Sequence, residues 1–361
     1  MIHKPLISPL ELKQIFPLQS SQKAFIEKSR SDIRQILEAK DSRLLLIMGP
    51  CSLHDAQAAK EYAIKLKQLA NEVSDQFLLV MRAYFEKPRT VLGWKGLLHD
   101  PELDNSNDIE KGLKVTRQLL LELTEIEIPL ASEFLEPASC AYLDDLVSWG
   151  CIGARTSASQ THRQMASGLP MPIGFKNTID GNVKTAVQGI VSCRQAHTYL
   201  GINQKGYISS FQTNGNGDGH LVLRGSESGT NYDPESIANA LKNLKLANLP
   251  LQLLVDCSHG NSNRNFEQQC VVFQSLIGQV IEGNPFIRGM LLESHLNAGN
   301  QQMTRLSDLQ YAVSLTDPCL DWSTTENLVQ WAYRKIKQEN SLKNSSKNAI
   351  LSDDFAFQRI C

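Results

Sequence analysis

Short apolar segments recur along most of the chain, and longer segments with helical spacing of apolar residues separate them. The apolar segments are LLLIMGPCS (44–52), FLLVMRAYF (77–85), PLASEFL (129–135), IGARTSA (152–158), MPIGFKN (171–177), HLVLRG (220–225), LQLLVDCSH (251–259) and GMLLESHL (289–296). The clearest amphipathic segments span 55–73, 108–123, 233–247 and 266–281. Three of these open with an Asp suited to capping a helix N-terminus.

Continuous apolar strands that alternate with helices indicate a parallel sheet covered by helices. Eight such strands predict an α/β fold of the (β/α)8 TIM-barrel type. A doubly wound open sheet is the alternative, but it normally carries a Gly-rich fingerprint after its first strand, and this sequence has none there. We expect an N-terminal, mostly helical extension over 1–40, a catalytic barrel over 41–338 and a polar C-terminal tail over 339–361.

One stretch breaks the alternation of strands and helices. Residues 197–212 alternate in polarity like a β-hairpin, with NQKG as the turn. Barrel formation does not require this insertion, so we expect it to serve a separate function. The following NGNGDG (214–219) lacks the acidic residue that ends a calcium loop, and it precedes a strand where a dinucleotide fingerprint would follow one. It is predicted to be a turn.

Composition narrows the classes of partner. The 361 residues carry a formal net charge of −2, which gives no broad basic field for nucleic acid or a membrane surface. No apolar run approaches the roughly 20 residues that cross a bilayer, and the N-terminus does not resemble a signal peptide. The eight cysteines are scattered without a CxxC pair. These features predict a reduced, cytoplasmic protein.

Reactive side chains follow the apolar runs at the ends of the predicted strands. They are Cys51, Arg82, Glu133, Arg155, Lys176, Arg224, His259 and Glu293, with Asp317 shortly after the last strand. A charge at one strand end is commonly a solvated loop residue. In a barrel, however, the carboxyl ends of all strands meet at one face, where barrel enzymes have their active sites. The repeated placement therefore predicts an active site.

The four Arg and Lys residues of this set, together with Lys87, predict an anionic ligand. Up to five cations would share the cavity, and their repulsion is tolerable only if a strongly anionic molecule neutralises it. These cations are Arg82, Lys87, Arg155, Lys176 and Arg224. The segment KPRT (87–90) adds a second phosphate-binding group through Arg89 and Thr90. We therefore expect two phosphorylated substrates.

The remaining members could hold a divalent metal ion. Cys51, His259, Glu293 and Asp317 offer one thiolate, one imidazole and two carboxylates, although their spacing matches no short zinc motif. A buried structural cysteine with a core histidine is an alternative interpretation. A thiol nucleophile formed by Cys51 and His259 is another, but a hydrolase has little need for so many anion-binding groups.

Several motifs together resemble the class I 3-deoxy-D-arabino-heptulosonate 7-phosphate synthases. They are GPCSLHD, MRAYFEKPRT, GWKGL, GARTSASQ, GFKN, LRG, DCSHGNS and ESHL, in order between about residues 20 and 335. The resemblance implies condensation of phosphoenolpyruvate with erythrose 4-phosphate, the first step of the shikimate pathway towards aromatic amino acids. It also implies a (β/α)8 barrel, a divalent metal (Mn²⁺, Fe²⁺, Co²⁺ or Zn²⁺) and a homodimer or homotetramer.

The resemblance assigns roles to individual residues. The metal ligands would be Cys51, His259, Glu293 and Asp317. The phosphoenolpyruvate contacts would be Arg82, Lys87, Arg155, Lys176 and Arg224, with the backbone of Gly153 and Ala154. The erythrose 4-phosphate contacts would be Pro88, Arg89 and Thr90. Lys87 and Glu133 are candidates for handling the protons of the attacking water, so the predicted catalytic set is Lys87, Glu133, Cys51 and His259.

Two departures from the family pattern motivate a second hypothesis. Ala158 replaces an acidic residue, and Thr178 occupies a position where the family has glycine after the lysine motif. Because a β-branched residue cannot readily adopt φ > 0, we expect a reshaped loop after Lys176. The alternative is thus a catalytically degenerate paralogue that binds metabolites without turnover.

The family also implies a feedback pocket for an aromatic amino acid near the inserted hairpin. The candidate residues here are Cys140, Pro170, Tyr199 and Gly201. Tyr199 offers a ring for stacking, and Gly201 leaves space that a larger side chain would fill. These two features favour tyrosine or phenylalanine over tryptophan as the effector.

Overall fold

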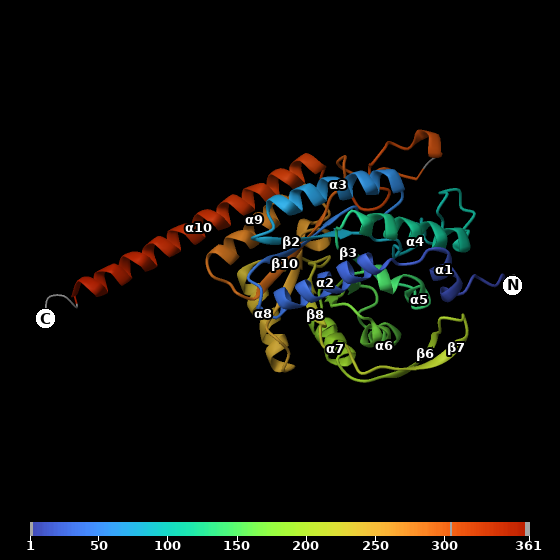
Figure 1. Cartoon of the computed structure of the whole chain (residues 1–361), viewed down its shortest axis with the longest axis horizontal. Coiled ribbons are helices and arrows are strands. Elements are labelled where there is room, and N and C mark those ends of the chain that lie inside the picture. The colour runs from blue at the N-terminus through green and yellow to red at the C-terminus, as the bar shows by residue number, and fades with distance from the viewer. Residues whose placement is uncertain (1–2, 304, 358–361) are drawn as a thin grey trace.

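The computed structural model describes residues 3–303 and 305–357, and its centre is a closed barrel of eight parallel strands (Figure 1). Around the barrel the strands follow the order β1-β10-β9-β8-β5-β4-β3-β2. Their bounds are β1 Leu44–Gly49, β2 Phe77–Arg82, β3 Leu130–Glu133, β4 Trp149–Ile152, β5 Ile173–Lys176, β8 His220–Leu223, β9 Leu253–Asp256 and β10 Ile287–Glu293. The predicted (β/α)8 barrel is confirmed.

The fourth strand lies earlier in the chain than predicted. We expected it in IGARTSA (152–158), but β4 ends at Ile152 and the chain then turns. The amides of Thr156 and Ser157 both donate to the Gly153 carbonyl at 3.0 Å, so their hydrogen bonds close a tight turn and are not available to a neighbouring strand. Trp149 and Gly150, which break a simple apolar run, begin the strand instead.

Helices surround the barrel. Their bounds are α1 Pro9–Ile15, α2 Ser20–Leu37, α3 Ala56–Glu72, α4 Ile109–Glu125, α5 Cys140–Leu143, α6 Gln160–Gly168, α7 Val183–Cys193, α8 Pro234–Leu246, α9 Gln268–Ile281 and α10 Trp322–Phe357. The four predicted amphipathic segments correspond to α3, α4, α8 and α9. The expected caps form: the carboxylates of Asp55, Asp108 and Asp233 accept amide hydrogen bonds at the starts of α3, α4 and α8.

Helix α2 covers the end of the barrel at which the strands begin. Its residues Ile33, Ile36 and Leu37 pack into the same buried cluster as the inward-facing side chains of the strands. Arg288, at the start of β10, donates to the Ile36 carbonyl at 2.7 Å and fixes the helix there. The opposite end, where the strands finish, is left for polar side chains.

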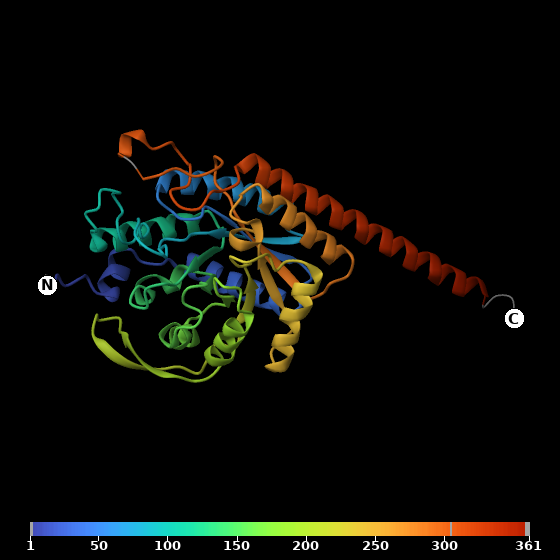
Figure 2. The same cartoon turned by 180° about the vertical axis from the view of Figure 1, so that it is seen from behind.

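The predicted hairpin forms a separate two-stranded sheet of β6 (Thr198–Ile202) and β7 (Ile208–Gln212). It reaches away from the barrel towards α1, as Figure 2 shows. The Leu10 amide donates to the Gln204 carbonyl at 2.8 Å, so the hairpin turn contacts the N-terminal extension. Tyr199 and Phe211 stack across the two strands with ring centroids 5.8 Å apart.

Helix α10 extends beyond the barrel in both views (Figures 1 and 2). It includes the first part of the predicted polar tail, while residues 358–361 lie outside the described residues. Within the part of the chain that the structure describes, no helix combines the length and apolar character needed to span a bilayer. The division at residues 40 and 338 stays a prediction.

Candidate active site

A cavity of about 340 Å³ opens at the end of the barrel where the strands finish. Most predicted site residues line it: Lys87, Pro88, Arg89, Thr90, Glu133, Gly153, Ala154, Arg155, Lys176, Arg224, His259, Glu293 and Asp317. The other two lie directly beneath this lining. Arg82 is fully buried with Nη2 2.9 Å from Glu293 Oε1, and Cys51 Sγ lies 3.1 Å from Lys87 Nζ. Strands far apart in sequence therefore bring the whole predicted set together.

The cations of the cavity are only partly neutralised by the protein. Arg82 and Lys176 each have a carboxylate partner, Glu293 and Asp256 respectively. Arg224 is buried, yet among the described residues it has no carboxylate within 4.0 Å. Burial lowers the pKa of Arg224, which reflects the cost of keeping this guanidinium charged in the protein interior. An anionic ligand would offset that cost.

The segment 87–90 lies at the mouth of the cavity. Arg155 Nη2 donates to Thr90 Oγ1 at 3.0 Å, which connects the two predicted phosphate-binding groups. Gly93 allows Arg89 to fold back over the segment. Its φ is +148°, and a Cβ there would lie 2.5 Å from Arg89 Nε. Arg89 and Thr90 are exposed and thus accessible to a second substrate.

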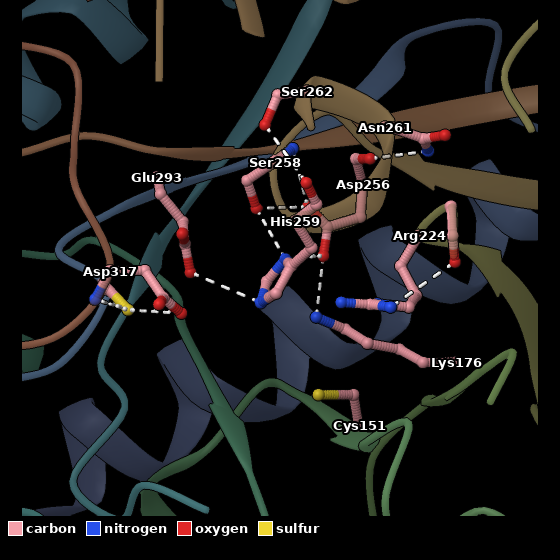
Figure 3. Close-up of polar contacts among 12 residues, drawn as sticks. Cys151, Lys176, Arg224, Asp256, Ser258, His259, Asn261, Ser262, Glu293 and Asp317 are labelled. Atoms are coloured by element: carbon pink, nitrogen blue, oxygen red, sulfur yellow. Dashed lines mark hydrogen bonds and ion pairs between the residues drawn. The ribbon is translucent and has the colours of Figure 1, made fainter. Parts of the chain in front are cut away.

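The residues predicted to bind metal fit a divalent ion. Donor atoms of Cys51, Glu293 and Asp317 lie within 4.8 Å of one another, and His259 Nε2 adjoins them, 3.8 Å from Glu293 Oε1 (Figure 3). Burial, and then the Glu293 carboxylate, raise the pKa of the Cys51 thiol to about 12. The thiol would therefore need a nearby cation to ionise at neutral pH, as metal ligation requires. One soft and several harder donors suit a transition metal.

The contacts do not favour a thiol nucleophile. Within the described chain, the Cys51 thiol hydrogen-bonds with Lys87 and Asp317, and no hydrogen bond joins it to His259. A cysteine nucleophile needs a base within hydrogen-bond reach and a lowered thiol pKa. His259 is not hydrogen-bonded to the thiol and the thiol pKa is raised, so the interpretation as a Cys51–His259 pair loses its structural basis.

Sequence reasoning missed Asp256, the last residue of β9. Its carboxylate lies 2.8 Å from Lys176 Nζ and 3.0 Å from His259 Nδ1 (Figure 3). Burial alone would raise the pKa of this carboxyl, but Lys176 and His259 lower it well below its usual range. The sequence could have indicated Asp256, because in VDCSH this carboxylate ends the apolar run of a strand. It lies two residues before Ser258 and three before His259.

Glu133 lies at the end of β3, against the backbone of the turn that follows β4. Its side chain is only 6% exposed, and it makes no side-chain hydrogen bond to another described residue. A Cβ at Gly153 would lie 1.9 Å from Glu133 Oε1. The absence of a side chain at Gly153 thus leaves room for this carboxylate beside the cavity.

The two departures from the family pattern leave the cavity intact. Thr178 is not among the described residues with positive φ, as expected for a β-branched residue. Its hydroxyl instead contacts Asp180 and accepts from the Asn182 amide, while Gly181 takes the left-handed conformation at φ +92°. Ala158 is exposed and does not line the cavity.

A larger cavity of about 850 Å³ lies between the hairpin and helices α5 and α6. Cys140, Tyr199 and Gly201 line it, as expected for a regulatory pocket, but Pro170 does not. The expected space beside Gly201 is occupied, because a Cβ there would lie 2.9 Å from the Phe211 ring. That ring also stacks on Tyr199, so one face of Tyr199 is covered by the protein.

The sequence is similar to a known family of enzymes over most of its length. Residues 16–330 match the family model described as the DAHP synthetase I family, where DAHP is 3-deoxy-D-arabino-heptulosonate 7-phosphate. The Tyr-sensitive phospho-2-dehydro-3-deoxyheptonate aldolase of Escherichia coli K12 is 49% identical over 92% of this chain and 93% of its own. The Phe-sensitive enzyme of the same organism is 42% identical over 92% and 95%.

A solved structure shows the same architecture. The phospho-2-dehydro-3-deoxyheptonate aldolase of Francisella tularensis SCHU S4 superposes with a TM-score of 0.91 at 40% sequence identity. The match covers 93% of this chain and 98% of that one. The similarity thus extends over most of both chains.

Proposed function

The chain belongs to the DAHP synthetase I family, and from this premise we propose how its cavity condenses phosphoenolpyruvate with erythrose 4-phosphate and water. The products are 3-deoxy-D-arabino-heptulosonate 7-phosphate and inorganic phosphate, and the reaction is the first step of aromatic amino-acid biosynthesis. One observation carries the assignment of the site. Two groups of phosphate-binding side chains and a set of metal-binding donors share one cavity at the carboxyl ends of the strands.

The cations of the cavity bind and orient the substrates. Arg82, Lys87, Arg155, Lys176 and Arg224, with the amides of Gly153 and Ala154, would hold the phosphate and carboxylate of phosphoenolpyruvate. Arg89 and Thr90, beside Pro88, would bind the phosphate of erythrose 4-phosphate at the mouth. Holding both substrates in one cavity converts a bimolecular step into an effectively unimolecular one.

Bond formation joins C3 of the enol phosphate to the aldehyde carbon while water adds at C2. Cys51, His259, Glu293 and Asp317 would hold a divalent ion, which supplies Lewis-acid polarisation of the aldehyde oxygen when bound. Glu133 is positioned beside the cavity to accept a proton of the water, and Lys87 is the second candidate for proton handling. Phosphate then leaves as the by-product.

Phosphate release tests the proposal directly. We expect inorganic phosphate to appear only when both substrates and one of Mn²⁺, Fe²⁺, Co²⁺ or Zn²⁺ are present, without any nucleotide. No release with any of the four metals would contradict the proposal. Calorimetry that detects phosphoenolpyruvate binding without turnover would instead support the degenerate paralogue. No observation on the described residues favours that alternative, because Thr178 and Ala158 leave the lining unaltered.

For the larger cavity, between the hairpin and helices α5 and α6, we propose that tyrosine binds there and inhibits the enzyme. A relative named Tyr-sensitive is 49% identical to this chain, against 42% for the Phe-sensitive one. The lining also contains two hydroxyls, Ser167 Oγ and Thr213 Oγ1, which are 2.7 Å apart. A phenol hydroxyl could join this pair, whereas phenylalanine would leave it without an additional partner.

The effector prediction is that tyrosine inhibits more strongly than phenylalanine or tryptophan. Gly168→Val should weaken that inhibition about 5-fold or more, because a Cβ at Gly168 already lies 2.9 Å from Thr213 Cγ2 and 3.2 Å from Tyr199 Oη. Gly217→Ala is the control, because a Cβ there has no atom within 4 Å. Titration of the three amino acids in the phosphate-release assay measures inhibition of the wild type and of both variants. The rate of each protein is compared with its own uninhibited rate. Stronger inhibition by phenylalanine in the wild type would contradict the assignment.

We further propose that the enzyme acts in the cytoplasm as a homodimer or homotetramer. The seven cysteines in the described chain are all free thiols, which agrees with a reducing compartment. Light scattering on the purified protein measures the oligomeric state.

A further inference from the structure

The carboxylate of Asp256 joins the two halves of the site. It is completely buried at the end of β9, and Oδ2 lies 2.8 Å from Lys176 Nζ and 3.0 Å from His259 Nδ1. Its other oxygen, Oδ1, accepts from the Ser258 amide at 3.0 Å and from the Ser258 hydroxyl at 2.7 Å. Four donors therefore surround one carboxylate, which is acceptor-only when ionised.

These contacts determine which nitrogen of His259 carries the proton. Nδ1 faces Asp256 Oδ2, which can only accept, and Ser258 Oγ at 2.7 Å. The Ser258 hydroxyl hydrogen is already donated to Asp256 Oδ1, so Ser258 also presents an acceptor to the ring. With acceptors facing Nδ1, the neutral His259 ring carries its proton on Nδ1. The lone pair of this neutral ring is then on Nε2, on the side where Glu293 Oε1 lies at 3.8 Å.

We propose that Asp256 is a positioning residue that holds His259 as an Nε2 metal ligand and Lys176 as a phosphate donor through one carboxylate. This inference rests on the proposed function, because it takes His259 as a metal ligand and Lys176 as a phosphoenolpyruvate contact. A carboxylate behind a metal-binding imidazole fixes both the tautomer and the ring orientation. Here the same carboxylate also fixes the ammonium group, so the anion site and the cation site share one support.

Asp256→Asn is the informative substitution. The oxygen of the new amide would stay with the Ser258 donors, which turns its NH₂ group towards Lys176 Nζ and His259 Nδ1. To avoid two donors facing each other, the imidazole must accept at Nδ1 and carry its proton on Nε2. The Nε2 lone pair is then lost. We expect the affinity for Mn²⁺ alone, measured by equilibrium dialysis, to fall about 10- to 100-fold. We also expect a higher KM for phosphoenolpyruvate.

Two further variants separate positioning from a general electrostatic effect. Asp256→Asn with Lys176→Met removes the unpaired ammonium that the single variant leaves buried. If Asp256 acts through His259, Mn²⁺ affinity stays low in this double variant; a return to the wild-type affinity overturns the proposal. Ser258→Ala keeps the carboxylate and should bind Mn²⁺ within about 3-fold of wild type, since Asp256 Oδ2 still accepts from Nδ1. An equal loss in Ser258→Ala would assign the role to Ser258 and overturn the proposal.

The tautomer itself can be observed without any variant. Nitrogen-15 NMR of metal-free wild-type protein should show His259 protonated at Nδ1, and protonation at Nε2 overturns the proposal even if Asp256→Asn fails to fold. The same measurements distinguish this inference from the proposed function. Wild-type protein that binds no divalent metal contradicts the proposed function. Wild-type protein that binds Mn²⁺, together with an Asp256→Asn variant that binds it equally well, contradicts only the role of Asp256.

Discussion

Cys51→Ala and His259→Ala should each lower phosphate release by more than about 10³-fold, the scale of losing a group central to catalysis, and should sharply lower bound metal. The two residues lie in the segments that follow β1 and β9, so each variant removes a different donor from the set that includes Glu293 and Asp317. With one donor gone, Glu293 still pairs with Arg82, and the Lys87 charge still acts on Asp317, so both cations compete with a metal ion. The expected loss of bound metal is therefore larger than the loss of one metal–ligand bond alone would cause.

Metal content by elemental analysis, together with a thermal melt, checks this result. The fold should persist, because the barrel core is apolar and does not depend on these donors. Cys193→Ala is the matched control. That thiol is also buried, but it lies on α7 and contacts the carbonyls of Ile190 and Asn216, far from the donor set in the fold. Unchanged metal stoichiometry in Cys51→Ala or in His259→Ala would remove that residue from the ligand set.

Strand-end residues were predictable because a parallel barrel imposes one geometry on all of them. Arg82, Lys176 and Glu293 are each the last residue of a strand, so alternation of strands and helices sufficed to bring them to one cavity. Arg89 and Thr90 lie in a loop, so periodicity could not select them; the residue types in KPRT indicated a phosphate-binding group there, and motif resemblance then added Pro88 and the assignment to erythrose 4-phosphate. The feedback residues depended on resemblance alone, and Pro170 is not in the cavity.

The misplaced β4 and the missed Asp256 have a common cause. Sequence patterns report burial, and they do not report which buried backbone or side-chain groups pair with each other. IGARTSA has the hydrophobicity of a strand start, but the hydrogen bonds to the Gly153 carbonyl make it a turn. Asp256 is polar within a buried strand, and its significance becomes visible only when Lys176 and His259 are found within 3.0 Å. The Phe211 ring beside Gly201 was unpredictable for the same reason, because it is a contact between the two strands of the hairpin.

Glu133→Gln should lower kcat by about 10²–10⁴-fold, the range for losing a general base, while the KM for phosphoenolpyruvate changes little. The substitution keeps the shape of the side chain and removes its ability to accept a proton as a carboxylate. Because Glu133 makes no side-chain hydrogen bond to another described residue, the thermal stability should also change little. Steady-state kinetics with both substrates measures kcat and the KM for phosphoenolpyruvate separately. An unchanged kcat would assign the proton transfer to another group, with Lys87 as the next candidate.

Gly153→Ala tests whether the position of that carboxylate matters as well as its charge. The added methyl would lie 1.9 Å from Glu133 Oε1, and the flexible end of a glutamate can swing away without disturbing the backbone. We therefore expect a fall in kcat in a folded protein. In the Glu133→Gln background, the same substitution should cost much less, because the two changes act on one group. Gly278→Ala, whose Cβ has no atom within 4 Å, is the control for both backgrounds. If the losses from Gly153→Ala and Glu133→Gln simply multiply, and KM for phosphoenolpyruvate rises, Gly153 acts through the substrate and not through Glu133.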